Sequence, residues 1–176
     1  MKENWDGTNF IIISVYGILP AFIHKVSQLP TSGCGYSFGP AILIIDKSWN
    51  DKGLLIHELT HVKQWYRSFG RSSNKLSTDM NYRIKTEIEA LSNQIKFYQK
   101  EEPDTDVEYL ITYFIKCLKD NFNARNLSYD FDGVEDKLRD KVLKQDHFIF
   151  PLEIKPWLSL KNYFSSIQKL IFQNNM

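Results

Sequence analysis

Few cysteines and no excess of one charge exclude several classes of protein. Cys34 and Cys117 are the two cysteines, and no CxxC pair or Cys/His cluster surrounds either of them. A zinc site built from thiolates is therefore not expected, and both thiols are expected to be reduced. Lys and Arg number 22 against 21 Asp and Glu, which gives a net charge of +1. This balance gives no reason to expect nucleic acid or an anionic membrane surface as a partner.

Targeting and membrane-spanning signals are also lacking. The first six residues are mixed in charge, unlike the basic start of a signal peptide. The apolar run at 10–23 is broken by Gly17 and Pro20, and it is shorter than the ~20 residues that a membrane helix needs. Such a run is more typical of a buried strand or helix. We expect a soluble, cytoplasmic protein with no membrane partner.

The length and composition are those of one ordinary globular domain. With 176 residues, of which 43% are hydrophobic and 24% charged, the chain can bury a core without a metal or a disulfide. We therefore expect residues 1–176 to form a single domain. The Gly, Pro and Ser residues within 27–40 predict a loop. The short β-branched run at 41–45 then predicts a strand.

The pattern after this strand is mostly helical, with capping residues and apolar positions at helical intervals. Helices are predicted over 52–69, from 78 or 79 to about 100, after the Thr105-x-x-Glu108 capping box, around 134–142 and over 156–172, with polar loops at 70–78 and 120–132. The expected fold class is α+β, in which a small sheet leads into a mostly helical body.

The most informative segment is an HExxH motif, His57-Glu58-Leu59-Thr60-His61. Two histidines four residues apart lie one above the other on a helix face, so His57 and His61 can converge on one Zn²⁺ ion. Glu58 then stands beside the metal without ligating it, where its carboxylate can take a proton from a zinc-bound water. With only four histidines in the chain, chance is a poor explanation of this match.

Catalytic zinc usually has three protein ligands and one open position, so a third ligand is required. The metzincin continuation would place Gly at position 64 and His at position 67, but Gln64 and Arg67 stand there. That class is excluded. The remaining common solution is a glutamate from a following helix, and Glu87 and Glu89 are the two candidates.

Helix geometry separates these two glutamates. At 100° per residue, the apolar positions of this helix form one stripe. Glu87 lies about 60° from the centre of the stripe, whereas Glu89 lies about 140° away on the far side. A carboxylate at the edge of a buried stripe is costly unless a cation compensates it. We assign Glu87 as the third ligand and Glu89 as an acid that is solvated or supports a ligand. The alternative for Glu87 is a boundary acid that meets Arg83 or solvent.

These residues resemble the gluzincin branch of the zincin-like metallopeptidases. The resemblance rests on two segments, His57-Glu58-Leu59-Thr60-His61-Val62-x-Gln64 and Tyr82-x-x-x-x-Glu87-x-Glu89-Ala90. It is strongest to small minimal gluzincins, including proteins encoded by bacteria and phages. It covers about 40–98 and leaves a helical extension at about 105–176.

In that group the third ligand is commonly a glutamate three residues before a small residue, a spacing that Glu87 and Ala90 keep. In relatives an Asp often follows the small residue and orients a ligand histidine. Here Leu91 stands in that position, so the orienting partner must come from elsewhere.

The resemblance implies a zinc metalloendopeptidase acting on peptide or protein substrates. Glu58 would be the general base, and His57, His61 and Glu87 would hold Zn²⁺. The strand at 41–45 would bind extended substrate by edge pairing. Tyr82 or Tyr66 would be the candidate for stabilising the oxyanion, although packing is the commoner role of such residues. His24 and His147 have no motif around them and are expected to be surface or satisfied histidines.

The ligand-bearing helices are expected to pack against each other and to bury seven apolar residues between them: Leu55, Leu59, Val62, Ile84, Ile88, Leu91 and Ile95.

A second hypothesis is a zincin-fold assembly component, such as a head-to-tail connector or ring of a phage particle, with little or no peptidase activity. It is motivated by the aromatic content and by an apolar stripe in the expected C-terminal helix. This stripe would bind protein partners, or would otherwise be core: Trp157, Leu160, Phe164, Ile167 and Ile171. A phage-encoded protein of this kind would be found in the virion rather than the cytoplasm.

Overall fold

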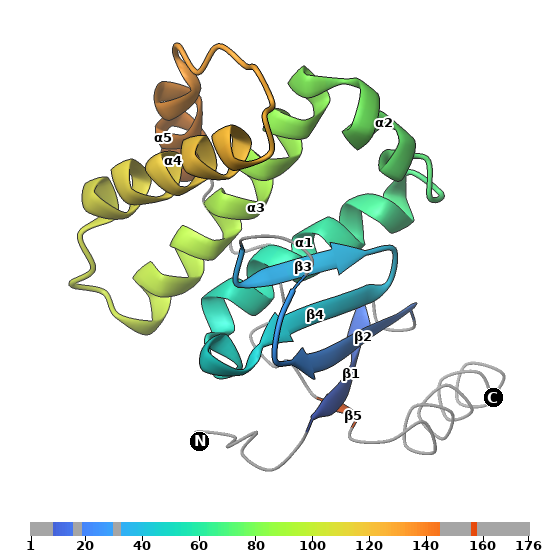
Figure 1. Ribbon diagram of the computed structural model, residues 1–176. Coiled ribbons are helices and arrows are strands. Elements are labelled where there is room, and N and C mark those ends of the chain that lie inside the picture. Colours follow the sequence, from blue (N-terminus) through green and yellow to red (C-terminus); the bar gives the residue numbers. More distant parts are fainter. Residues whose placement is uncertain (1–8, 16–18, 30–32, 145–155, 158–176) are drawn as a thin grey trace, which may run out of the picture.

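The computed structural model describes residues 9–15, 19–29, 33–144 and 156–157. Its strands are β1 (Phe10–Val15), β2 (Leu19–Val26), β3 (Gly35–Phe38), β4 (Ala41–Ile45) and β5 (Pro156–Trp157). Its helices are α1 (Lys52–Arg67), α2 (Ser72–Thr78), α3 (Met80–Glu101), α4 (Val107–Ala124) and α5 (Val134–Lys144). The sheet lies on one side of α1, and α3, α4 and α5 lie on the other (Figure 1). The predicted α+β class is confirmed.

The sheet is mixed, with the order β3-β4-β2-β1-β5. The apolar run predicted as a strand or helix forms the antiparallel hairpin β1–β2, with Ile12 opposite Phe22. β2 pairs with β4 in parallel, and β3 pairs with β4 antiparallel. Every second side chain of β4 is buried, as expected for a strand with a helix on one face.

The prediction that residues 41–45 form the substrate-pairing edge was wrong. These residues form β4, which lies between β2 and β3 and has neighbours on both sides. The edge strand on this side is β3, which lies within the segment predicted to be a loop. Because β3 has only four residues and Gly39 follows it at φ +58°, it carries too little pattern to be recognised in the sequence.

The apolar residues form two separate clusters, one on each side of α3. The first cluster packs the sheet against α1 and includes Ile42, Leu55 and Val62. The second packs α3 against α4 and α5 and includes Ile84 and Ile95. All seven predicted core residues are buried, but they do not form one interface between α1 and α3 as expected.

The face of α3 that contacts α1 is instead small or polar. Asn93 donates a hydrogen bond to the Thr60 hydroxyl at 3.1 Å, and Gln64 donates to the backbone oxygen of Thr86 at 3.0 Å. Ala90, between these contacts, is completely buried. Small side chains let the two helices approach closely while their apolar faces point to opposite cores.

Several predicted boundaries were confirmed and others were wrong. Asp51 and Asp79 accept hydrogen bonds from the first turns of α1 and α3, at the predicted starts of these helices. The cap of α4 is Asp106 rather than Thr105, and α4 continues to residue 124. α2 occupies a segment predicted to be a loop.

The prediction of a helix over 156–172 was wrong at its first two residues, because Pro156 and Trp157 form β5, which pairs with β1. The remainder of that stripe, 158–172, lies outside the described residues. Within the part of the chain that the structure describes, no helix combines the length and apolar character that crossing a membrane requires.

Gly53 permits a close contact between α1 and α3, which predicts an unusual response to alanine. The Tyr98 hydroxyl donates to Asp51 at 2.8 Å, and a Cβ at position 53 would overlap the Tyr98 ring. Helix propensity alone favours Ala over Gly by about 1 kcal/mol. We expect Gly53→Ala instead to lower the free energy of unfolding by about 1–3 kcal/mol, as overpacking does.

Urea unfolding measures this change, and Tyr98→Ala provides the control background. With the ring removed, Gly53→Ala should become neutral or stabilising. If Gly53→Ala stabilises the wild-type chain, the contact does not restrict this position.

Candidate metal centre

His57 and His61 lie on one face of α1, one turn apart, as the motif predicted. Their Nε2 atoms are 3.2 Å apart, and their rings meet edge to face. Both side chains are nearly buried, with exposed fractions of 12% and 13%. Two nitrogen lone pairs that face each other at this distance repel unless a proton or a metal ion lies between them. Either a bridging proton or a metal ion would satisfy this arrangement.

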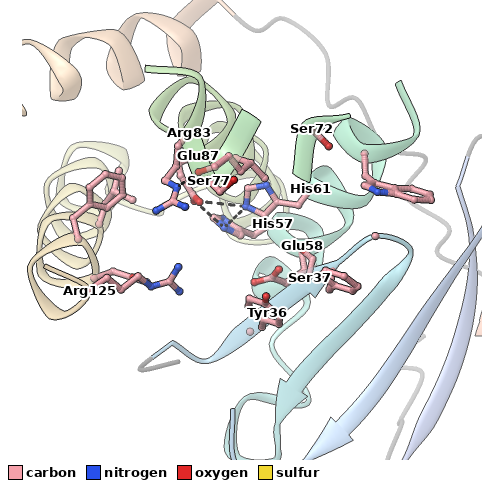
Figure 2. Close-up of a pocket in the computed structure, with 18 residues that line it drawn as sticks. Tyr36, Ser37, His57, Glu58, His61, Ser72, Ser77, Arg83, Glu87 and Arg125 are labelled. Atoms are coloured by element: carbon pink, nitrogen blue, oxygen red, sulfur yellow. Dashed lines mark hydrogen bonds and ion pairs between the residues drawn. The ribbon is translucent and has the colours of Figure 1, made fainter. Parts of the chain in front are cut away.

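Glu87 approaches both imidazoles from α3 (Figure 2). Its Oε2 atom lies 3.5 Å from Nε2 of His57 and 3.6 Å from Nε2 of His61. Two ligands at ~2.05 Å from a tetrahedral zinc ion are separated by about 3.3 Å. The observed separations of 3.2, 3.5 and 3.6 Å fit that requirement. The three residues have the right atoms and spacing to hold Zn²⁺, and their role as ligands stays a prediction.

The position of Glu87 on α3 explains why it reaches this point. The core stripe of α3 and the face that contacts α1 lie on nearly opposite sides of the helix, because Asn93 is about 180° from Ile84. Glu87, at about 60° from the stripe, lies on the flank between the two faces. The alternative pairing with Arg83 is not observed, because the ion pairs of Glu87 are with the two histidines.

Without a metal, these charges bind a proton strongly. Burial by itself would lower the pKa of His61, but the negative charge of Glu87 and its hydrogen bonding outweigh burial and raise the pKa of His61 to about 9. Burial would likewise raise the pKa of Glu87, but the charge of His61 and hydrogen bonds from both histidines hold it well below its usual range. A strongly held proton therefore takes the place that a cation would fill.

Gln64 fixes the orientation of the His61 ring. The side-chain oxygen of Gln64 lies 2.9 Å from Nδ1 of His61, while its nitrogen donates to the backbone oxygen of Thr86 and to Glu89. Because the amide nitrogen already has these two acceptors, the amide oxygen faces the ring and Nδ1–H is the donor. Nε2 of His61 is then the ring nitrogen that can hold either a metal ion or a proton beside Glu87.

Glu89 supports this arrangement from behind. Its Oε2 accepts from Gln64 at 3.1 Å, and its Oε1 forms an ion pair with Arg67 at 2.8 Å. The chain of contacts therefore runs from Arg67 through Glu89 and Gln64 to His61. The expectation that Glu89 would be solvated or would support a ligand is consistent with this second role.

His57 has no such support. Its Nδ1 atom is buried and has no hydrogen-bond partner among the described residues. The partner that the sequence leads one to expect for a ligand histidine is present at His61, where it is Gln64. The structure gives an orienting residue to His61 but none to His57, so the two imidazoles are held unequally.

Glu58 points from α1 toward β3, beside the three residues (Figure 2). It is almost buried, with 5% of the residue exposed. A Cβ at position 35 would lie 2.6 Å from the Oε1 atom of Glu58, so only glycine lets the edge strand pass so near this carboxylate. Gly35 was not singled out in the sequence, because one glycine in a Gly-rich segment carries no specific signal.

The centre lies where two parts of one cleft meet. One part is a cavity of about 320 Å³ that β3, α1 and the end of α4 surround, and the other is a cavity of about 780 Å³ along α4. Six residues line both parts: Gly35, His57, Glu58, Glu87, Leu118 and Asn121. The edge strand β3 and the helix α4 form facing walls, and the candidate ligands lie between them.

The two tyrosines considered as oxyanion stabilisers do not line this cleft. The Tyr66 hydroxyl donates to the backbone oxygen of Pro20 at 2.8 Å, and Lys75 lies over the Tyr82 ring. The packing interpretation is confirmed for Tyr66, which packs against the core between the sheet and α1, and stays a prediction for Tyr82. His24 is exposed and bonds Asn9 through Nδ1, as expected for a surface histidine, and His147 lies outside the described residues.

No family model, curated protein or solved structure matches this chain. The interpretation of the centre therefore rests on the identities of its residues and on their geometry.

The contact between Gln64 and His61 predicts how zinc affinity depends on residues that do not touch the metal. Residues that orient a ligand histidine commonly contribute 10–100-fold to metal affinity. We expect Gln64→Ala to weaken zinc binding by about that factor, and Glu89→Gln to weaken it by less. Competition with a chromophoric chelator measures both. Gln99→Ala, on the same helix as Glu89 but away from the centre, is the control and should not differ from wild type.

The raised pKa of His61 predicts a pH dependence in the metal-free protein. The pair of protonated His61 and ionised Glu87 stabilises the fold fully between pH 4.5 and pH 6.5, the ordinary pKa values of the two groups, and this stabilisation is lost as pH rises through about 9. Urea unfolding in the presence of a chelator should show the advantage of wild type over Glu87→Gln shrinking by about 1–3 kcal/mol between pH 6.5 and 9.5. Parallel curves for the two proteins would exclude this coupling.

Proposed function

We propose that this protein is a zinc-dependent endopeptidase with a zincin-like arrangement of strand and helices. The observation that carries the proposal is the meeting of His57, His61 and Glu87 at separations of 3.2–3.6 Å, beside the Glu58 carboxylate. A His₂Glu set with a nearby carboxylate is the donor set of many hydrolytic zinc sites.

The zinc ion, when bound, would supply the Lewis acidity that polarises a peptide carbonyl and activates a water molecule. Glu58 would accept a proton from the attacking water molecule while the water oxygen adds to the carbonyl carbon. The same carboxyl group would deliver that proton to the amide nitrogen as the carbon–nitrogen bond breaks. The absence of a side chain at Gly35 leaves room for this carboxylate beside the edge strand.

The cleft supports an extended substrate. β3 is an edge strand, so a peptide can add to it through backbone hydrogen bonds. Because the cleft continues on both sides of the centre, a chain can extend in both directions from the bond that is cut. This favours an endopeptidase over an enzyme that removes single terminal residues. The assembly hypothesis rests mainly on 158–172, and the geometry of the centre adds nothing to it.

The substitution Glu58→Gln tests this function. We expect the variant to bind one zinc ion per chain like wild type and to cleave peptides about 10²–10⁴-fold more slowly, the usual contribution of a general base. Elemental analysis and cleavage of a peptide mixture measure the two properties. Glu101→Gln, an exposed acid outside the cleft, is the matched control and should retain full activity.

Two results would contradict the proposal. Equal cleavage by Glu58→Gln and wild type would exclude this mechanism. A wild-type protein that holds zinc tightly, forms a stable ring and cleaves nothing would instead favour the assembly role.

A further inference from the structure

Two arginines enter the smaller part of the cleft next to the candidate metal centre. Arg83 comes from α3, one turn before Glu87, and Arg125 follows the last turn of α4. Both side chains reach into the space beside His57 and Glu87 (Figure 2). They belong to different helices, so the fold and not a local repeat brings the two cations together.

Arg83 is held in a fixed orientation. Its Nε–H donates to the backbone oxygen of Leu76 at 2.8 Å, and its guanidinium lies 5.9 Å from the centre of the Phe122 ring. These contacts occupy one nitrogen and one face of the group and leave the terminal nitrogens for another acceptor. Burial and the neighbouring charge of Arg125 lower the pKa of Arg83, but an arginine remains protonated under all ordinary conditions.

Neither guanidinium forms an ion pair with a carboxylate among the described residues. Arg67 and Arg139, by contrast, each form an ion pair at 3.0 Å or less. Glu87 attracts Arg83 at longer range, but its carboxylate is engaged by the two histidines. The two neighbouring guanidinium groups repel each other because both are positively charged. An anion bound by both would offset that repulsion.

We propose that Arg83 and Arg125 form a subsite that binds a carboxylate of the substrate close to the scissile bond. The inference rests on the proposed function and specifies its substrate class, which is peptides that carry a carboxylate near the bond that is cut. Guanidinium groups suit this task because each can donate two parallel hydrogen bonds to one carboxylate. The carboxylate belongs either to an Asp or Glu side chain or to the C-terminus of the peptide.

Three peptide sets distinguish these sources. The first consists of heptapeptides blocked at both ends with one Glu at varied positions, and the second has Gln in its place. The third has Gln and a free C-terminal carboxylate. Binding is measured to the zinc-loaded Glu58→Gln protein, which should cut the peptides only slowly, and also to the metal-free wild-type protein.

We expect one of the carboxylate-bearing sets to bind about tenfold more tightly than the blocked Gln set, as a charge-assisted hydrogen bond would give. The preference should fall below about threefold in Arg125→Ala and in Arg83→Gln. Arg71→Ala removes the same charge from an exposed position outside the cleft and should retain the preference in full. Because Arg125 is exposed, its replacement is expected to leave the fold intact.

The outcomes separate this inference from the function on which it rests. Equal binding of all three sets, or a preference that survives both arginine substitutions, would overturn the subsite. A preference that depends on the arginines and persists without metal would support the subsite even if no peptide is cleaved. Efficient cleavage that is indifferent to carboxylates would support the peptidase and exclude the subsite.

Discussion

The close contact between α1 and α3 is the constraint on which the candidate centre depends. His57 and His61 lie on α1 and Glu87 lies on α3, so their atoms meet only if the two helices keep a fixed separation and rotation. Buried hydrogen bonds set that register, from Asn93 to Thr60 and from Gln64 to the Thr86 backbone. A slip of either helix would leave these polar groups unpaired in a buried interface, which is costly. The polar contact therefore specifies the geometry, while the two apolar clusters on either side stabilise it.

The sequence predicted α1, α3 and the meeting of His57, His61 and Glu87 because each depends on strong local signals. Capping aspartates, a regular apolar stripe and an i, i+4 histidine pair can be read without tertiary information. The apolar stripe does not by itself explain the position of Glu87, because the stripe of α3 faces α4 and α5 and not α1. Glu87 reaches the centre from the flank between two faces. One apolar stripe cannot reveal that the opposite, polar face of the same helix is also buried.

β3, α2 and the orienting role of Gln64 could not be predicted in this way. β3 and α2 have four and seven residues, so too few turns or alternations exist to show a period. Pairing of β3 with β4 is set by contacts between segments, which also determine that residues 41–45 are interior. In the sequence, Gln64 excludes the metzincin pattern and belongs to the segment that resembles gluzincins, but neither observation indicates its contact with His61. Its role depends on Glu89, 25 residues away, and becomes visible only when α3 is placed against α1.

The charges around the cleft favour an anionic substrate group most strongly when a metal ion is in place. Glu58 and Glu87 carry two negative charges and protonated His61 offsets only one of them, so the metal-free centre by itself repels a carboxylate. A bound divalent ion offsets both charges, and Arg83 and Arg125 then give the smaller part of the cleft a net positive potential. Selectivity for carboxylates and metal loading would therefore be coupled: the preference should persist without metal but be weaker. A preference that is stronger without metal would contradict this electrostatic account.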